Sequence, residues 1–433
     1  MKTILLIGAG KSATVLIDYL TDESEKNNWK FIIADANKEQ ILLKTKNSRY
    51  AEAVQLDINN EKQRSKLIEK SHIVISMMPP HLHFLVAKDC VEYRKHLLTA
   101  SYLDKQISSL RDEINNRKLL FLCEMGLDPG IDHMSALLLL NKIKSEGGEV
   151  VSFRSHCGGL VAPESDDNPW HYKISWNPRN VVLAGKAGAV YKENNSTITE
   201  KYEELFRTDR SIETGDKTIG SLSYYPNRDS LPYLDLYQLH HVETFVRTTL
   251  RYPDFMEGWK YIVSMNLTDE TVSYESDGKT LQDFFTTYVG ERSAGLPPLV
   301  IRQLEFLGMN DHETFINKGL CSAADVLQLA LESKLVLQPH DKDLVVMVHE
   351  IEYVKNGEKK SLFSSLIVKG EDSMNTAMAK TVGLPLGIAA KLILEDKLKL
   401  KGLHIPTSEA IYIPVLEELE KHGICFIEKI VNG

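Results

Sequence analysis

The first part of the chain alternates short apolar runs with segments whose apolar residues recur at helical spacing. The apolar runs that predict buried strands cover residues 2–7, 30–34, 53–56, 72–76, 96–99 and 119–122. Between them, segments such as 15–20 and 82–93 keep the spacing of amphipathic helices. Because strands that alternate with helical crossovers pair in parallel, this part of the chain predicts a doubly wound α/β sheet of the Rossmann type.

After residue 147 the pattern changes to longer strands separated by turns. Strands are expected at residues 149–156, 181–182, 343–354 and 362–368. The Asn356-Gly357 pair predicts the hairpin turn that joins the last two strands. Residues 158–170 are polar and rich in glycine and proline, which indicates a loop, and residues 284–335 are mainly helical in pattern.

The change of pattern predicts three segments. A dinucleotide-binding domain is expected at residues 1–129, and an inserted α+β domain for substrate binding and dimerisation at 130–372. The C-terminal segment, 373–433, is expected to pack back on the first domain. Within it, residues 376–394 are rich in alanine and predict one or two helices, broken at Gly383-Leu384-Pro385.

The first predicted strand ends in Gly8-Ala9-Gly10-Lys11-Ser12-Ala13. The first glycine of this pattern makes the turn, the second lets the backbone approach a pyrophosphate, and Ala13 lets the following helix pack closely on the sheet. Because the pattern stands between a strand and a helix, it predicts a dinucleotide-binding loop. Cofactor contacts are therefore expected from Gly8, Gly10, Lys11, Ser12 and Ala13.

Asp35 ends the second predicted strand, about two dozen residues beyond the glycines. A carboxylate there accepts hydrogen bonds from the ribose hydroxyls and repels a 2′-phosphate, so Asp35 favours NAD over NADP. Asp35 can also cap the helix expected at residues 38–43, and both roles can hold at once. Asp57 and Ile58 follow the third strand and are expected to flank the adenine.

Polar residues follow the fourth, fifth and sixth predicted strands. Ser76, Met77 and Met78 end the fourth strand and are expected near the nicotinamide half of the cofactor. Ligands of open α/β sheets bind outside the carboxyl ends of the strands, so Tyr102 after the fifth strand and Asp128 after the sixth are candidates for the active site. For Tyr102, a half-buried tyrosine at a strand end is an equally open interpretation.

Composition and charge limit the class of partner. The 433 residues carry a formal net charge of −9, with 43% hydrophobic and 26% charged residues, as in a globular protein with no general attraction for nucleic acid or anionic membranes. An acidic substrate would then need a few placed arginines. Arg228 and Arg251 are candidates, because guanidinium groups bind carboxylates bidentately, although each alone is more typical of a surface charge.

The remaining signals argue against other kinds of chemistry and location. The five cysteines are scattered without a Cys-x-x-Cys pair, and we interpret them as reduced thiols. No metal site is expected, because no cysteines or carboxylates complete a zinc spacing around His81 and His83 or around His240 and His241. We see no signal-peptide pattern at the start and no apolar run long enough to span a bilayer, so a cytoplasmic location is expected.

The stretch from Gly126 to Met134, Gly-Leu-Asp-Pro-Gly-Ile-Asp-His-Met, closely resembles the signature of saccharopine reductase, the L-glutamate-forming saccharopine dehydrogenase. Several other blocks are long and idiosyncratic, and together they extend the resemblance over nearly the whole chain. The similar blocks are residues 8–13, 99–102, 157–165, 168–169, 175–176, 225–230, 249–252, 377–380 and 382–383.

In that family the enzyme joins 2-aminoadipate 6-semialdehyde to glutamate as an imine and reduces the imine to saccharopine, or runs the reverse. The resemblance implies substrate contacts from Ser101, Tyr102, Asp128, Arg228, Thr249, Leu250 and Arg251. It implies nucleotide contacts from the Gly10 region and from Ser76, Met77, Met78, Leu127, Asp128, Pro129 and Trp176. It also implies a homodimer. Asp128 and Tyr102 are our candidates for stabilising or relaying the iminium proton.

One departure from the family concerns the cofactor. The family commonly carries a serine, threonine or arginine set for the 2′-phosphate of NADPH, whereas this chain has Asp35-Ala36-Asn37. NAD(P)(H) is therefore expected, with NAD favoured.

Two alternatives to this function exist. The first is a carboxynorspermidine- or homospermidine-type imine reductase, whose polyamine substrate needs an acidic pocket that the paired arginines do not suggest. The second is a nucleotide-sensing protein without turnover, which would need none of the substrate residues.

Overall fold

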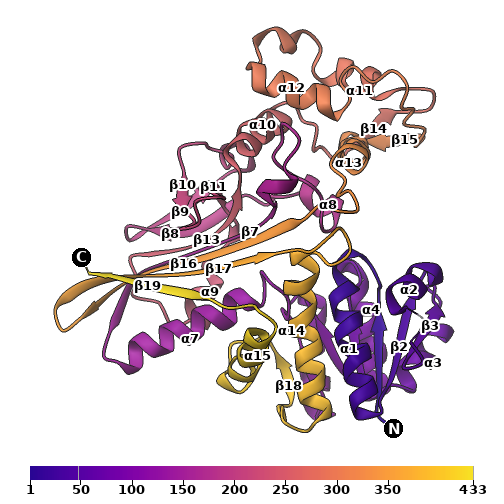
Figure 1. The fold of residues 1–433 in the computed structure, drawn as a ribbon, viewed down its shortest axis with the longest axis vertical. Helices are drawn as coiled ribbons and strands as arrows, with labels where there is room; N and C mark the ends of the chain where they lie inside the picture. Colours follow the sequence, from indigo (N-terminus) through magenta and orange to yellow (C-terminus); the bar gives the residue numbers. More distant parts are fainter. Residues whose placement is uncertain (47, 433) are drawn as a thin grey trace. The chain divides into compact units, whose positions relative to one another are not determined.

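The computed structural model describes residues 1–46 and 48–432, and the chain forms two compact units (Figure 1). The first unit comprises Met1–Glu146 and Met374–Cys425, and the second comprises Gly147–Ser373 and the chain from Phe426 onward. The helix that follows residue 130 thus lies in the first unit, and the last strand lies in the second. The three predicted segments stay a prediction about domains.

The first unit is built on a parallel sheet of seven strands in the order β18-β6-β5-β4-β1-β2-β3. Its strands are β1 (Thr3–Ile7), β2 (Lys30–Asp35), β3 (Ala51–Gln55), β4 (Ile73–Ser76), β5 (His96–Thr99), β6 (Leu120–Leu122) and β18 (Gly402–His404). The predicted doubly wound sheet is confirmed. Strand β18 was not predicted, because three residues are too few to show a periodic pattern.

The helices of the first unit lie between or after these strands along the chain. They are α1 (Thr14–Asn27), α2 (Lys38–Thr45), α3 (Glu61–Glu69), α4 (His83–Glu92), α5 (Lys105–Ser109), α6 (Arg111–Asn116), α7 (Ile131–Ser145), α14 (Ala377–Leu394) and α15 (Glu409–Lys421). The predicted break at Gly383-Leu384-Pro385 is wrong, because α14 continues through Pro385. Its glycines face α1 so closely that a Cβ on Gly387 would lie 2.6 Å from Tyr19 Cδ1. This tight packing stabilises the helix despite the proline.

Helix α14 is long and apolar enough to cross a membrane, by length and composition alone. The expectation that no segment reaches this length was therefore wrong. However, 83% of the apolar window is buried inside the protein, as in the core helix of a globular protein. Two of its residues, Ala377 and Ala379, are fully buried.

The second unit contains a mixed sheet whose main path is β10-β11-β13-β7-β16-β17-β19. Its strands are β7 (Glu149–Val161), β8 (Ala189–Glu193), β9 (Ser196–Glu200), β10 (Ser211–Glu213), β11 (Ser221–Pro226), β12 (Arg228–Asp229), β13 (Thr244–Arg251), β16 (Asp343–Lys355), β17 (Glu358–Lys369) and β19 (Ile427–Asn432). Strands β14 (Val272–Glu275) and β15 (Leu320–Ser322) form a separate pair. The hairpin predicted at Asn356-Gly357 joins β16 and β17, and both residues have positive φ.

Two local predictions for the second unit are wrong. Residues 181–182 lie in helix α8 (Pro178–Val182), where Asn177 caps the helix by accepting from the N–H of Arg179. The loop expected from residue 158 begins later, because β7 continues through Gly158 to Val161. Strand β13 approaches so closely there that a Cβ on Gly158 would lie 2.6 Å from the Leu250 carbonyl oxygen. Glycine at this position thus reflects close strand packing rather than a turn.

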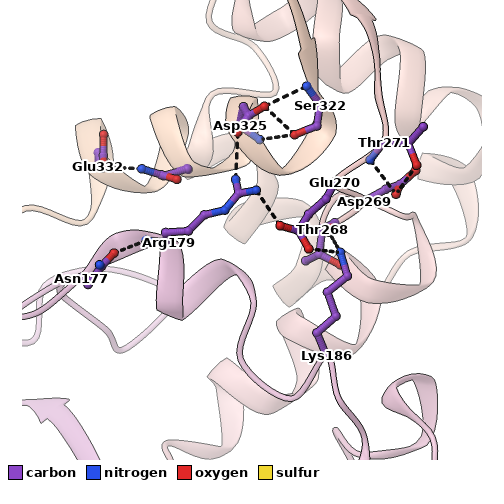
Figure 2. A network of polar contacts seen from close by, with 11 residues as sticks. Asn177, Arg179, Lys186, Thr268, Asp269, Glu270, Thr271, Ser322, Asp325 and Glu332 are labelled. Carbon is purple, nitrogen blue, oxygen red and sulfur yellow. Dashed lines mark hydrogen bonds and ion pairs between the residues drawn. The ribbon is translucent and has the colours of Figure 1, made fainter. Parts of the chain in front are cut away.

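Helices and a network of charged side chains complete the second unit. The remaining helices are α9 (Pro232–Leu236), α10 (Pro253–Ser264), α11 (Leu281–Tyr288), α12 (Pro298–Leu307) and α13 (Ala323–Lys334). Figure 2 shows Arg179 donating to Asp325, at the start of α13, and to Glu270, each at 2.9 Å. Lys186 donates to the other oxygen of Glu270 at 3.1 Å. We call Arg179, Lys186, Glu270 and Asp325 the Arg179 network.

Candidate active site

The glycine loop of the first unit is shaped for a ligand rather than for packing alone. Gly8 has φ +100°, and a Cβ there would lie 2.9 Å from the backbone carbonyl of Met77, so the loop after β1 rests directly on the loop after β4. Gly10 is exposed, and a Cβ there would meet nothing within 4 Å. A backbone that is open at Gly10 and continues through Lys11–Ala13 into helix α1 fits the pyrophosphate of a dinucleotide.

Two side chains hold this loop in place. Asp35 Oδ2 accepts from the backbone N–H of Ala9 at 2.7 Å, and Asp35 Oδ1 accepts from Asn37 N–H at 2.9 Å. The buried Lys44 on α2 donates to the carbonyl oxygens of Ala9 and Gly10, at 2.7 and 2.5 Å. Burial lowers the pKa of Lys44 to about 8, while the nearby Asp35 carboxylate opposes this shift. Hydrogen bonds therefore hold both an N–H group and two carbonyl groups of the glycine loop.

The alternative that Asp35 caps the following helix is wrong, because the cap of α2 is Asn37. Asn37 Oδ1 accepts from Gln40 N–H at 3.1 Å. Asp35 instead supports the glycine loop through its bond to Ala9 N–H, and its contact with the ribose stays a prediction. Asp57 is exposed and Ile58 is half-buried after β3, and their contact with the adenine stays a prediction.

A hydrogen-bonded chain joins the ends of β4 and β5. Ser76 Oγ lies 2.8 Å from His83 Nδ1, and His83 Nε2 lies 2.8 Å from Ser101 Oγ. His83 is the first residue of α4 and is 2% exposed. Burial lowers its pKa to about 4, so the imidazole is neutral at physiological pH.

The two residues considered for proton transfer are hydrogen-bonded to each other. The Tyr102 hydroxyl donates to Asp128 Oδ1 at 2.9 Å, and both residues are half-buried. Beneath them, the buried Glu124 accepts from Leu103 N–H at 3.0 Å and pairs with His133 at 2.8 Å. The loop that carries Tyr102 is thus tied to the segment that carries Asp128.

The turn that presents Asp128 is built from closely packed glycines. A Cβ on Gly130 would lie 2.1 Å from the carbonyl oxygen of Gly126, and φ at Gly130 is +147°. A Cβ on Gly126 would lie 3.2 Å from Ala100 Cβ, next to Ser101. Larger residues at either glycine would displace the turn. The sequence Gly-Leu-Asp-Pro-Gly therefore fixes where Asp128 lies relative to the end of β5. Leu127 and Pro129 in the same turn are buried.

In the second unit, Arg251 is a buried cation with open hydrogen-bonding capacity. Its side chain is 3% exposed and its guanidinium carbon lies 5.3 Å from the ring centroid of Tyr172 and 5.4 Å from that of Phe255. One terminal nitrogen donates to the Leu250 carbonyl at 2.7 Å, whereas Nε has no partner among the described residues. Buried charges are normally paired, so this arrangement suits an anionic ligand.

The other predicted residues of the second unit differ in exposure. Arg228 is exposed with φ +55°, and Thr249 is half-buried on β13. The side chain of Leu250 is fully buried in a core cluster with Leu160 and Leu222. Trp176 donates to the Tyr172 hydroxyl at 2.9 Å, so it adjoins the ring that lies against Arg251. Their contacts with ligand stay predictions.

Sequence reasoning missed Lys44, Tyr172 and His83. In the sequence, Lys44 is indistinguishable from an exposed lysine on a surface helix. Only its bonds to the glycine loop in the structure reveal its role. His83 was considered only as half of a metal-binding pair with His81. His83 lies four residues after Pro79, at the start of a helix that follows a strand. This position could have indicated that His83 lies near the strand ends of the site.

The family models match both parts of the chain. A model described as the saccharopine dehydrogenase NADP binding domain matches residues 4–121. A second, described as the saccharopine dehydrogenase C-terminal domain, matches residues 126–424. Together they span the glycine loop, the Asp128 turn and Arg251.

Known proteins agree with these matches. The chain is 32% identical to saccharopine dehydrogenase [NADP(+), L-glutamate-forming] of Saccharomyces cerevisiae, over 99% of both chains. It is 30% identical to alpha-aminoadipic semialdehyde synthase of Arabidopsis thaliana. That match covers 98% of this chain but only 44% of the plant protein. The apo structure of the L-glutamate-forming yeast enzyme matches with a TM-score of 0.88, 29% identity and full coverage of both chains. The resemblance inferred from the sequence is confirmed, and the chain belongs to the saccharopine dehydrogenase family.

Proposed function

We propose that this protein is an NAD(P)-dependent oxidoreductase that converts saccharopine to glutamate and 2-aminoadipate 6-semialdehyde, or the reverse, in lysine metabolism. Saccharopine has three carboxylates and a secondary amine. The observation that favours this substrate class most is the buried Arg251, whose Nε has no partner among the described residues. A polyamine substrate would instead place a second cation near this guanidinium, so the polyamine-reductase alternative is disfavoured.

In the saccharopine-consuming direction, the carbon beside the secondary amine loses a hydride and becomes the carbon of an imine. The bound nicotinamide supplies the hydride acceptor. Water then adds to the imine carbon and the carbon–nitrogen bond breaks, which leaves the aldehyde and the amino group of glutamate. The chain's own residues position the reacting carbon and stabilise positive charge on the nitrogen.

Asp128 and Tyr102 are proposed for the proton and charge steps. A carboxylate near the nitrogen favours its positively charged form, which makes the carbon a better hydride acceptor in the synthetic direction. The Tyr102 hydroxyl, which donates to Asp128 Oδ1 at 2.9 Å, offers a proton path beside that carboxylate. Arg251 and Arg228 are proposed to bind substrate carboxylates, and Ser101 to hydrogen-bond the substrate.

We further propose that NAD(H) is preferred over NADP(H), unlike in the NADP-dependent relatives. The support is Asp35, whose two carboxylate oxygens face the glycine loop and Asn37. A 2′-phosphate at the adjoining ribose would meet this negative charge. Lys44 does not offset it freely, because two of the three ammonium donors are used by the loop carbonyls.

A homodimer and a cytoplasmic location complete the proposal. The family resemblance supports dimerisation through the second unit, and light scattering on the purified protein would test it. Fractionation of cells would test the location.

The direct test of the reaction is the initial rate of nicotinamide reduction, followed by absorbance, with saccharopine and either NAD or NADP. We expect turnover with either coenzyme alone, and a higher kcat/KM with NAD than with NADP. Turnover with NADP alone would keep the reaction and overturn the coenzyme preference. No saccharopine-dependent reduction with either coenzyme would overturn the proposed function and favour the nucleotide-sensing alternative.

A further inference from the structure

The chain Ser76–His83–Ser101 joins two strand ends that the proposed function assigns to different ligands. Ser76 ends β4, in the segment proposed to contact the nucleotide, and Ser101 follows β5, in the segment proposed to contact substrate. The two hydroxyl oxygens each lie 2.8 Å from a different nitrogen of the same imidazole. Because His83 is 2% exposed, the imidazole itself is shielded from water, and its contact with Ser76 is buried.

A neutral imidazole imposes opposite roles on the two serines. One ring nitrogen carries a hydrogen and donates, and the other accepts, so one serine accepts from His83 while the other donates to it. Burial keeps the ring in this neutral state by lowering the pKa of His83 to about 4. The hydrogen-bonding role of Ser101 therefore depends on which ring nitrogen carries the hydrogen.

The surroundings of Ser76 decide between the two tautomers. Ser76 is 0% exposed, and among the described residues His83 is the only hydrogen-bond partner of its hydroxyl. If His83 donated to Ser76, the buried Ser76 hydroxyl hydrogen would have no acceptor, which costs about 1–3 kcal/mol. If Ser76 donates to Nδ1, no group is left unsatisfied. The hydrogen then lies on Nε2 and points at Ser101 Oγ.

We propose that His83 is a positioning residue whose Nε2–H tautomer turns the Ser101 hydroxyl into a hydrogen-bond donor aimed at a substrate carboxylate. Ser101 is half-buried, and its hydroxyl has no other side-chain or backbone partner in the described part of the chain. Since Ser101 accepts from His83, its own hydrogen is available to an incoming acceptor. This inference rests on the proposed function for the identity of the substrate.

The first test is independent of turnover and uses the wild-type protein. Nitrogen-15 NMR of histidine side chains distinguishes the two tautomers and the charged form. We expect a neutral His83 with hydrogen on Nε2 throughout pH 6 to 8, with His83→Asn identifying the signal. A hydrogen on Nδ1, or a doubly protonated ring in this range, would overturn the inference even if saccharopine were not a substrate.

The second test separates the two contacts by substitution. The amide of asparagine reaches about as far as Nδ1, and that of glutamine about as far as Nε2. His83→Asn should keep the Ser76 contact and raise KM for saccharopine roughly 3- to 10-fold, the effect of one hydrogen bond, with KM for the coenzyme within about 2-fold of wild type. His83→Gln should leave KM for saccharopine within about 2-fold of wild type.

A double variant tests whether His83 acts through Ser101, and a second histidine serves as the control. On a Ser101→Ala background, His83→Asn should raise KM for saccharopine no further, because the two residues act through one hydroxyl. His96→Asn is the control: His96 is also neutral through burial but accepts from Leu120 N–H at 2.9 Å, away from the candidate site. Multiplicative effects of His83→Asn and Ser101→Ala, or equal KM changes in His83→Asn and His96→Asn, would overturn the inference. Absence of saccharopine turnover in the wild type would overturn only the proposed function.

Discussion

Arg251 and Arg179 show two different uses of the same side chain. Arg179 has 29% of its side chain exposed and donates to two carboxylates, Asp325 and Glu270, at 2.9 Å each. Arg251 is 3% exposed, lies against the rings of Tyr172 and Phe255, and forms no ion pair with a described carboxylate. A paired surface guanidinium needs no further explanation. A buried guanidinium without a carboxylate is costly, and that cost points to a ligand.

The same contrast separates the carboxylates of the two regions. Asp325 belongs to the Arg179 network and completes the capping box of α13, where it accepts from the N–H of the N-cap residue Ser322. Asp128 stands at a strand end, on a turn shaped by Gly126 and Gly130, where Tyr102 donates to it. We infer that the Arg179 network stabilises the fold, while the strand-end residues are positioned for chemistry.

The largest expected effect comes from Asp128→Asn. Removing a charge that assists proton and iminium chemistry should lower kcat about 100-fold or more, because general acid–base groups typically contribute that much. Stopped-flow or steady-state rates with saturating saccharopine and coenzyme measure it. Asp325→Asn is the control. It should lower the free energy of unfolding by about 1 kcal/mol while kcat stays within 2-fold of wild type. A comparable loss of kcat in both variants would show that Asp128 has no special role in the chemistry.

Arg251→Ala should lower kcat/KM for saccharopine about 10- to 150-fold, mainly through KM. The reason is the loss of a charge-assisted hydrogen bond, worth about 1.5–3 kcal/mol. Arg251→Lys keeps the charge without the planar fork and should fall between Ala and wild type. Saturation kinetics with saccharopine decide this point. Unchanged KM in the alanine variant would show that the buried guanidinium serves packing only.

Asp35→Asn should raise the ratio of kcat/KM for NADP to that for NAD about 10-fold, equal to about 1.4 kcal/mol. The amide oxygen can still accept from Ala9 N–H, so the loop is preserved while the repulsive charge is removed. Parallel initial rates with the two coenzymes give the ratio. An unchanged ratio would mean that Asp35 only fastens the glycine loop.

The free energy of unfolding should depend on pH through His83 and His96. Burial lowers the pKa of His83 and of His96 to about 4, below the value of about 6.5 expected in the unfolded chain. Between these values the unfolded state binds more protons than the folded state, so this contribution is full above pH 6.5 and is lost as pH falls toward 4. The free energy of unfolding should fall by up to about 1.4 kcal/mol per pH unit for each histidine.

Urea unfolding at a series of pH values measures this slope. Because asparagine does not titrate, His96→Asn should flatten the slope by one histidine's share without changing KM for saccharopine. An identical slope in His96→Asn and wild type would show that His96 is not responsible for acid sensitivity.

The smallest effect is expected for Arg179→Ala. Partly exposed ion pairs contribute about 0–1 kcal/mol and are screened by salt. We expect a loss of about 0.5 kcal/mol in the free energy of unfolding, shrinking at high salt, with unchanged KM for saccharopine. A loss of activity larger than that of Arg251→Ala would reverse the comparison.

Local sequence patterns were sufficient where a single strand and its following turn define a site. The glycine loop and the Asp128 turn both follow apolar strands, so both could be predicted. A Cβ at Gly8, Gly126 or Gly130 would lie within 3.1 Å of other atoms, whereas Gly10 is open. Six strands of the parallel sheet were predicted for the same reason.

Contacts between distant segments could not be predicted in this way. His83 bonds residues from two different strand ends, and Lys44 reaches the loop after β1 from helix α2. Val181 and Val182 favour a strand by propensity, yet they form the end of a helix with both side chains fully buried. Tertiary packing determined these features, and no local pattern encodes it.

Product analysis after saccharopine oxidation tests the proposed reaction directly. The secondary amine of saccharopine can be oxidised on either side, giving glutamate with 2-aminoadipate 6-semialdehyde, or lysine with 2-oxoglutarate. We predict one glutamate, and no lysine, for each nicotinamide reduced. Formation of lysine and 2-oxoglutarate, or no product at all, would contradict it.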